Sequence, residues 1–231
     1  GIAHKSLGEY ERAIEYQEKH LKTALAIGDR AGEGRAYEHL GVAYQALKDN
    51  QKAIEYYEKF WKIALEIGDR AGERLAYGNL GDAYQSLGDY RNAIECYEKH
   101  LKIALEIGDR AGEERAYENL GIAHKSLGEY ERAIEYQEKH LKTALELGDR
   151  AGEGRAYEHL AVAYQALKDN QKTIKYYEKF LKIALEIGDR AGERLAYGNL
   201  GDAYQSLGDY RNVIECYEKH LKIALEIGDR A

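Results

Sequence analysis

The sequence predicts an all-α fold, an α-solenoid of antiparallel helix pairs, and three observations support this. Leu40, Leu80 and Leu120 each precede a glycine, and successive members of this series lie 40 residues apart (80 − 40 and 120 − 80). Apolar residues between the turns follow helical spacing, and the chain contains no proline to interrupt a helix. A repeat of this length is typical of stacked units that bury their apolar faces only against one another.

Each repeat is expected to begin with one helix, and in the repeat that follows Gly68 this first helix is expected at residues 70–87. Asp69 can cap its amino end by accepting from a free backbone N–H, and Gly88 can adopt the left-handed conformation that ends it. The predicted apolar stripe comprises Leu75, Ala76, Leu80, Ala83, Tyr84 and Leu87. Its three-and-four spacing indicates a helix with one buried face.

The second helix is expected to follow at once, because Asp89 can cap a helix that ends before Gly108. Its predicted stripe comprises Ala93, Ile94, Tyr97, Leu101, Ala104 and Leu105. Small residues such as Gly81 are expected where helices approach closely, with large aromatic rings filling the space beside them. Each unit is therefore an antiparallel helix pair.

A longer period lies above this one, since residues 1–111 align with residues 121–231 with few differences, among them Gly41 with Ala161 and Trp61 with Leu181. Residues 1–231 are therefore expected to form a single solenoid of about five to six 40-residue repeats, arranged as two near-identical 120-residue super-repeats. Neither end carries a polar cap, so we expect a slice of a longer array whose ends can associate head to tail.

Composition excludes several function classes. The net charge of −7 argues against nucleic acid, whose binding needs clustered lysine and arginine. No apolar stretch reaches the roughly 18 residues of a membrane helix and no signal pattern opens the chain, so we expect no membrane partner and an intracellular, cytoplasmic location. Cys96 and Cys216 occupy the same repeat position three repeats apart, too far for a disulfide, and are expected to be reduced packing residues.

The sequence offers no constellation for catalysis or for a metal. The eight histidines recur singly in different repeats, without the convergent ligands that zinc requires. The glycines fall singly at turns and helix contacts rather than in a phosphate-binding loop, and the serines lack an adjacent base. We therefore predict no enzymatic activity, no metal and no cofactor.

The pattern formed by Tyr77, Leu80, Gly81, Tyr84, Tyr90, Ala93 and Tyr97 resembles the tetratricopeptide repeat over the whole chain. The unit is longer than the usual period of about 34 residues. With its linker Gly108-Asp109-Arg110-Ala111-Gly112-Glu113, it is similar to the Leu-Gly-Asn repeat proteins that orient the mitotic spindle and modulate G-protein signalling, and to long animal and bacterial arrays. The resemblance implies a right-handed superhelix whose first helices line a concave groove for an extended peptide.

By that resemblance the peptide-binding wall comprises Arg35, Gln45, Asn79, Asp82, Gln85, Arg115, Asn119, Lys125, Arg155, Gln165, Asn199, Asp202 and Gln205. Side-chain amides can both donate to and accept from a peptide backbone, and arginine can bind carboxylates. A second asparagine expected after Leu-Gly is replaced at five positions, for example by Val42 and Asp82, so the specific ligands of the spindle-orientation proteins do not transfer. The sign of the peptide's charge stays open.

The sequence thus favours a non-catalytic protein–protein interaction scaffold. Two alternatives remain open. The chain can be a structural spacer or a rod that assembles head to tail, or a constructed repeat protein without a natural ligand. The retained Cys96, Trp61 and Lys48 favour natural origin over idealisation, because Lys48 stands where glycine would relieve left-handed strain of about 1 kcal/mol.

Overall fold

The computed structural model describes the backbone of residues 2–228 and the side chains of residues 9–228, and over this range it consists of helices and turns without a strand. The helices are α1 Ile2–Ile27, α2 Arg30–Ala46, α3 Asn50–Ile67, α4 Arg70–Ser86, α5 Tyr90–Ile107, α6 Arg110–Ser126, α7 Tyr130–Leu147, α8 Arg150–Ala166, α9 Asn170–Ile187, α10 Arg190–Leu207 and α11 Tyr210–Glu226. Contacts divide the chain into two compact units, residues 1–116 and 117–231, and each is described by itself.

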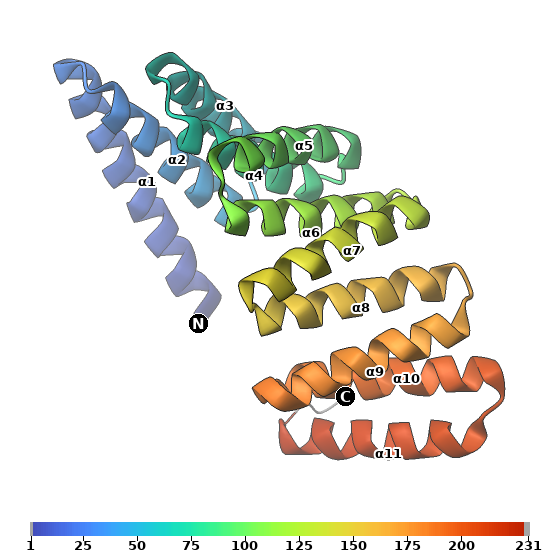
Figure 1. Ribbon diagram of the computed structural model, residues 1–231. Helices are drawn as coiled ribbons and strands as arrows, with labels where there is room; N and C mark the ends of the chain where they lie inside the picture. Colours follow the sequence, from blue (N-terminus) through green and yellow to red (C-terminus); the bar gives the residue numbers. More distant parts are fainter. Residues whose placement is uncertain (1, 229–231) are drawn as a thin grey trace. The chain divides into compact units, whose positions relative to one another are not determined.

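Within each unit, consecutive helices pack against one another (Figure 1). In the first unit α1 packs on α2, α2 on α3, α3 on α4 and α4 on α5, and in the second unit the same succession runs from α7 to α11. Turns of two or three residues join the helices, so neighbours run antiparallel. The predicted α-solenoid of helix pairs is confirmed.

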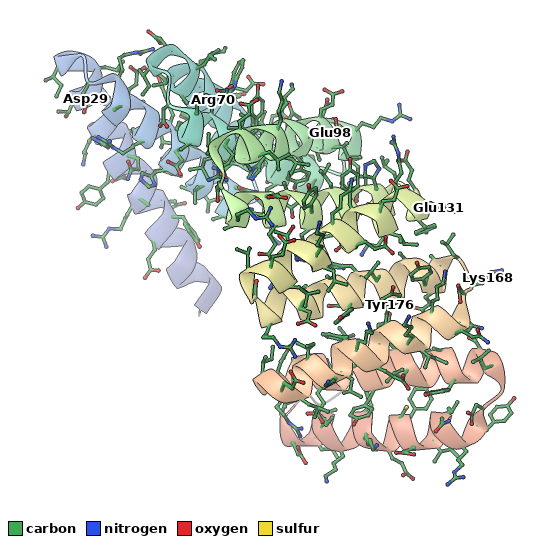
Figure 2. All side chains as sticks on the ribbon, in the orientation of Figure 1. Asp29, Arg70, Glu98, Glu131, Lys168 and Tyr176 are labelled. Carbon is green, nitrogen blue, oxygen red and sulfur yellow. The ribbon has the colours of Figure 1, made fainter. Side chains whose placement is uncertain are left out.

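The helix ends match the sequence prediction closely. Asp69 Oδ1 accepts a hydrogen bond from the Gly72 N–H at 2.9 Å, and the equivalent Asp29 is labelled at the start of α2 in Figure 2. Gly68 and Gly88 are left-handed, with φ of 71° and 78°. At the position of Gly88, Lys48 has φ of 61°, as predicted from the absent glycine. The turn chemistry therefore sets the repeat boundaries.

The core of the first unit pairs a tyrosine of a second helix with a glycine of a first helix. Tyr57 and Tyr97 are fully buried, and a β-carbon on Gly41 or Gly81 would overlap their rings. The predicted fit of small against large residues is confirmed. The prediction was wrong for Leu87 and Leu105, which are 48% and 53% exposed. Leu105 follows the fully buried Ala104, and one residue turns a helix by about 100°, which places Leu105 on the flank.

An arginine–glutamate joint links the two helices of one repeat, and the sequence analysis missed it. Arg70 pairs with Glu73 in its own first turn and with Glu106 at the end of the next second helix. Equivalent joints are Arg30 with Glu33 and Glu66, Arg150 with Glu153 and Glu186, and Arg190 with Glu193 and Glu226. The inner glutamates are buried, so each joint fixes the start of a first helix against the end of the second helix that follows it.

Candidate functional site

The structure places every predicted wall residue on a first helix. Arg35 and Gln45 lie on α2, Asn79, Asp82 and Gln85 on α4, Arg115, Asn119 and Lys125 on α6, Arg155 and Gln165 on α8, and Asn199, Asp202 and Gln205 on α10. None of them is buried. Residues three apart, such as Asp82 and Gln85, share one helix face. Their binding role stays a prediction, but their position on accessible first-helix surface is clear.

In the first unit, Asp82 is held from two sides. The Tyr97 hydroxyl donates to Asp82 Oδ1 at 2.8 Å, and Arg115 Nη2 donates to Asp82 Oδ2 at 2.5 Å. Burial, and then the Asp82 charge, raise the pKa of Tyr97 above its usual value, so the hydroxyl keeps its proton. The carboxylate of Asp82 is therefore fixed in place, rather than mobile as a solvated side chain would be.

The amide residues of the wall also accept from buried tyrosines. The Tyr57 hydroxyl donates to Gln45 Oε1 at 2.8 Å, and the equivalent bond from Tyr177 to Gln165 is 3.3 Å. The second unit has Ala161 where the first has Gly41, and that extra methyl group stands against the Tyr177 ring. Part of the hydrogen-bonding capacity predicted for ligand recognition is thus used inside the protein.

Glu118 gathers polar groups in the second unit. Arg155 Nε donates to Glu118 Oε1 at 2.8 Å, while His159 Nε2 and His140 Nε2 lie 3.9 and 4.0 Å from its carboxylate. Burial lowers the pKa of both histidines to about 4, so they are neutral at pH 7. The Gln137 amide donates to the Glu118 backbone carbonyl at 3.1 Å and joins α7 to α6.

A hollow opens beside the wall in the first unit. It has a volume of about 260 Å³ and lies among α2, α3 and α4, with Phe60, Ile63 and Leu75 among its apolar residues. Arg35, a predicted wall residue, and Glu38 stand at its side. Gly34 also lines it, whereas the later repeats of this super-repeat carry Arg74 or Glu114 at that position.

The second unit has the equivalent hollow among α8, α9 and α10. Its volume is about 440 Å³, and it is lined by Gly154, Arg155, Glu158, Phe180 and Ile183 among others. Burial raises the pKa of Glu158, with Asp189 and Glu118 adding to the effect against Lys125. Sequence reasoning missed both hollows, although the recurrence of glycine with phenylalanine, Gly34 with Phe60 and Gly154 with Phe180, was a signal for them.

Comparison with protein families decides the assignment. The model described as "Tetratricopeptide repeat" matches residues 1–66, 73–146 and 152–226. The chain belongs to this family. Tetratricopeptide repeats generally mediate protein–protein interactions, so a protein-binding role is typical of the fold described above.

Solved structures with this tetratricopeptide arrangement include BtubC from P. vanneervenii, which is 25% identical, with 96% of this chain and 93% of that chain covered and a TM-score of 0.83. The tetratricopeptide sensor of a STAND signal-transduction ATPase from Pyrococcus horikoshii is 26% identical, with a TM-score of 0.84; coverage is 97% of this chain and 34% of the other. A putative kinesin light chain from Podosopora anserina shares the fold. It is 20% identical, with a TM-score of 0.71 and with 85% of this chain and 97% of that chain covered. No curated protein matches the sequence.

No group of three or more histidine, cysteine or acidic side chains within residues 9–228 is arranged to hold a metal ion. None of the described helices combines the length and apolar composition needed to cross a bilayer. Cys96 and Cys216 are buried free thiols, and burial raises the pKa of Cys96 to about 11, so it is protonated at neutral pH.

Proposed function

We propose that this tetratricopeptide chain is a non-catalytic scaffold that binds an extended segment of a partner protein along its first helices. The observation that carries the proposal is the duplicated hollow. In each unit an arginine of the predicted wall, Arg35 or Arg155, stands beside an apolar hollow that a glycine helps to line. Ligand sites commonly combine an apolar hollow with a few polar groups that fix orientation.

The chemistry of the hollows suits one peptide side chain in each unit. Phe60 and Ile63, or Phe180 and Ile183, supply the apolar contact for an aliphatic side chain. The wall residues Asn79 and Asn199 on the following first helices are half-buried and can pair with a peptide backbone. Two equivalent sites allow one partner to engage twice, which raises its overall affinity.

Two finer features of the proposal come from likeness alone. The similar STAND ATPase from Pyrococcus horikoshii has a tetratricopeptide repeat sensor, which supports a recognition role for this chain. The linker Gly108-Asp109-Arg110-Ala111-Gly112-Glu113 supports membership of the 40-residue subclass similar to the Leu-Gly-Asn proteins. We propose a cytoplasmic partner. The direct test of the role is whether the purified protein binds an extended peptide.

We expect Gly34→Arg together with Gly154→Arg to weaken peptide binding at least tenfold, because arginine side chains fill both hollows. The probe is a peptide selected from a random library against the unaltered protein, and the measurement is fluorescence anisotropy. Arg74 and Arg194 occupy the same repeat position naturally, but beside His100 and His220 rather than a phenylalanine, so a circular dichroism spectrum equal to that of the unaltered protein is the check that the variant folds. Glu98→Ala, an exposed change on α5 labelled in Figure 2, is the matched control and should leave binding unchanged. Unchanged affinity in the double arginine variant would contradict the proposal.

A second candidate, head-to-tail assembly, is favoured by the outer face of α11. Ile214, Leu221 and Leu225 on this helix are 60%, 60% and 69% exposed, and a hollow of about 470 Å³ runs over Leu221 and Leu225. We expect sedimentation velocity to show concentration-dependent association that Leu221→Glu with Leu225→Glu abolishes. Lys102→Glu, at the equivalent exposed position of α5 and outside this hollow, also changes the net charge by −2 and is the control for charge alone. A protein that sediments as a monomer at all concentrations would exclude this function.

A further inference from the structure

Three of the repeats carry the same stack of aromatic rings on the side of the second helices. The central ring belongs to a second helix and lies between two rings of the preceding first helix. Tyr56 lies 5.3 Å from Tyr44, nearly parallel to it, and 6.2 Å from Tyr37, measured between ring centroids. The equivalents are Tyr136 at 5.3 Å from His124 and 6.5 Å from Tyr117, and Tyr176 at 5.4 Å from Tyr164 and 6.2 Å from Tyr157.

A lysine covers each stack. Lys59 Nζ lies 4.8 Å from the centroid of the central Tyr56 ring and 5.6 Å from that of Tyr37. The equivalent lysines cover two rings in the same way: Lys139 over Tyr117 and Tyr136, and Lys179 over Tyr157 and Tyr176. Cations at this distance from a ring face are attracted to its electrons. The three rings and the lysine therefore form one recurring element; Tyr176 is labelled on α9 in Figure 2.

The repeat built from α4 and α5 lacks the central ring. Cys96 occupies the position that Tyr56 and Tyr136 hold 40 residues on either side (96 − 56 and 136 − 96). The two outer rings, Tyr77 and Tyr84, are retained, and Lys99 Nζ lies 5.3 Å from the Tyr77 ring centroid. The short cysteine side chain cannot reach between the two rings as a tyrosine does.

A hollow of about 330 Å³ lies where the central ring would be. Its residues include Tyr77, Tyr84 and Leu80 of α4, Cys96 and Lys99 of α5, and Trp61 of α3. An apolar cavity of about 150 Å³ is large enough to bind benzene. The Trp61 ring lies 5.8 Å from Tyr77 and adds an aromatic side that the Leu181 position of the second unit does not have.

We propose that this aromatic slot, formed by Trp61, Tyr77, Leu80, Tyr84, Cys96 and Lys99, binds a phenylalanine or tyrosine side chain of a partner protein. The occupant follows from the neighbouring repeats, in which a tyrosine ring fills the same place between the same two positions of the first helix. Lys99 stands where Lys59 covers both the outer and the central ring, so it is placed to cover an inserted ring as well.

The slot is separate from the hollows of the proposed peptide-binding wall. It lies among α3, α4 and α5, and none of its residues lines the hollow beside Gly34. Burial keeps the Cys96 thiol protonated, so the thiol serves as an apolar floor rather than as a nucleophile. A partner can thus be held on the second helices whether or not a peptide occupies the first helices, and failure of one proposal leaves the other intact.

Trp61 is the sole tryptophan of the chain and reports on the slot directly. The probe is the blocked tripeptide acetyl-Gly-Phe-Gly-amide, with acetyl-Gly-Leu-Gly-amide as the comparison, and the measurement is the change in Trp61 fluorescence on titration. We expect a saturable change in fluorescence with the phenylalanine peptide. The affinity for the leucine peptide should be at least tenfold lower. Equal responses to the two peptides, or no saturable response to either, would overturn the proposal.

Variants locate the response within the protein. Cys96→Tyr recreates the Tyr56 arrangement, so it should fill the slot, raise the melting temperature and abolish the response. Cys96→Ala keeps the slot open and should retain the response, as should Cys216→Tyr, which makes the same change in the second unit. Tyr84→Leu removes one aromatic side and should weaken binding several-fold, which gives a second readout independent of Cys96→Tyr. A response in Cys96→Tyr equal to that of the unaltered protein would refute the assignment to this slot.

Discussion

Replacing Tyr97 with alanine is expected to lower the free energy of unfolding by about 3–5 kcal/mol, the usual cost of truncating a large buried aromatic residue. The Tyr97 ring is fully buried against the backbone at Gly81, where a β-carbon would overlap it. Its hydroxyl donates to Asp82 at 2.8 Å, so the alanine variant also loses a hydrogen bond to a charged group. The measurement is equilibrium unfolding in urea followed by circular dichroism.

Tyr217→Ala is the matched control, because Tyr217 stands in the same local sequence on α11. It makes the same hydrogen bonds, to Asp202 at 2.5 Å and to Gln205 at 3.4 Å, but it is 38% exposed. Its truncation should therefore cost about 1–2 kcal/mol, less than half of the loss at Tyr97. Similar losses of unfolding free energy at Tyr97 and Tyr217 would show that burial of the tyrosine between helices does not set the stability of the repeat. Tyr97→Phe keeps the ring and isolates the hydroxyl, at about 1–2 kcal/mol.

The pairing of Tyr97 with Gly81 illustrates what the sequence could predict. Small and large residues recur at fixed positions of the two helices, so their contact followed from the period together with close packing. The exposure of Leu105 did not follow, because periodicity gives the direction of the buried face and not its width. The width depends on how far the neighbouring helix reaches over that face, and that is a tertiary property.

The arginine–glutamate joints show a second limit. Arg70 and Glu106 lie 36 residues apart (106 − 70), and nothing local in either helix indicates that their side chains meet. Their pairing depends on where a second helix ends relative to the first turn of the preceding first helix. A spacing four short of the 40-residue period, repeated down the chain, is the signal that could have revealed the joint.

The candidate site was predictable in location more than in chemistry. The resemblance put the wall residues on the first helices, and the structure places these residues on α2, α4, α6, α8 and α10, while their binding role stays a prediction. It did not reveal that Gln45 and Asp82 accept from buried tyrosine hydroxyls, because those tyrosines belong to second helices. The hollows could be predicted only by comparing equivalent positions of different repeats. Gly34 is informative because the next repeat has Arg74 there, and Cys96 is informative because the preceding repeat has Tyr56 there.

Acidification from pH 7 to about 4.5 is expected to destabilise the protein by several kcal/mol, because buried neutral histidines such as His100 and His140 resist protonation in the folded chain. Both side chains are almost completely buried, and burial lowers the pKa of each from 6.5 to about 4. For His100, Arg74 and Arg115 lower the pKa further, while Asp109 and the Gly112 carbonyl act against them. Both histidines are neutral in the folded protein at pH 7.

The sign follows from proton uptake. Between about pH 6.5 and pH 4 the unfolded chain binds a proton at each of these histidines and the folded chain does not, so stability falls as the pH falls through this window. Above about pH 6.5 the contribution is complete and constant. One pKa unit corresponds to about 1.4 kcal/mol, so each histidine contributes about 2–3 kcal/mol to the loss by pH 4.5. The measurement is the urea midpoint at several pH values between 7 and 4.5.

The chain contains its own control for His100, because Phe60 and Phe180 occupy the same repeat position and each accompanies a glycine, Gly34 or Gly154. His100→Phe combined with Arg74→Gly recreates this pair without a titrating ring. The loss of stability between pH 7 and pH 4.5 should be smaller in this variant by about 2–3 kcal/mol than in Arg74→Gly alone, which is the reference because Arg74 also pairs with Asp109 at 3.0 Å. A variant that loses as much stability as the unaltered protein would place the acid sensitivity outside His100.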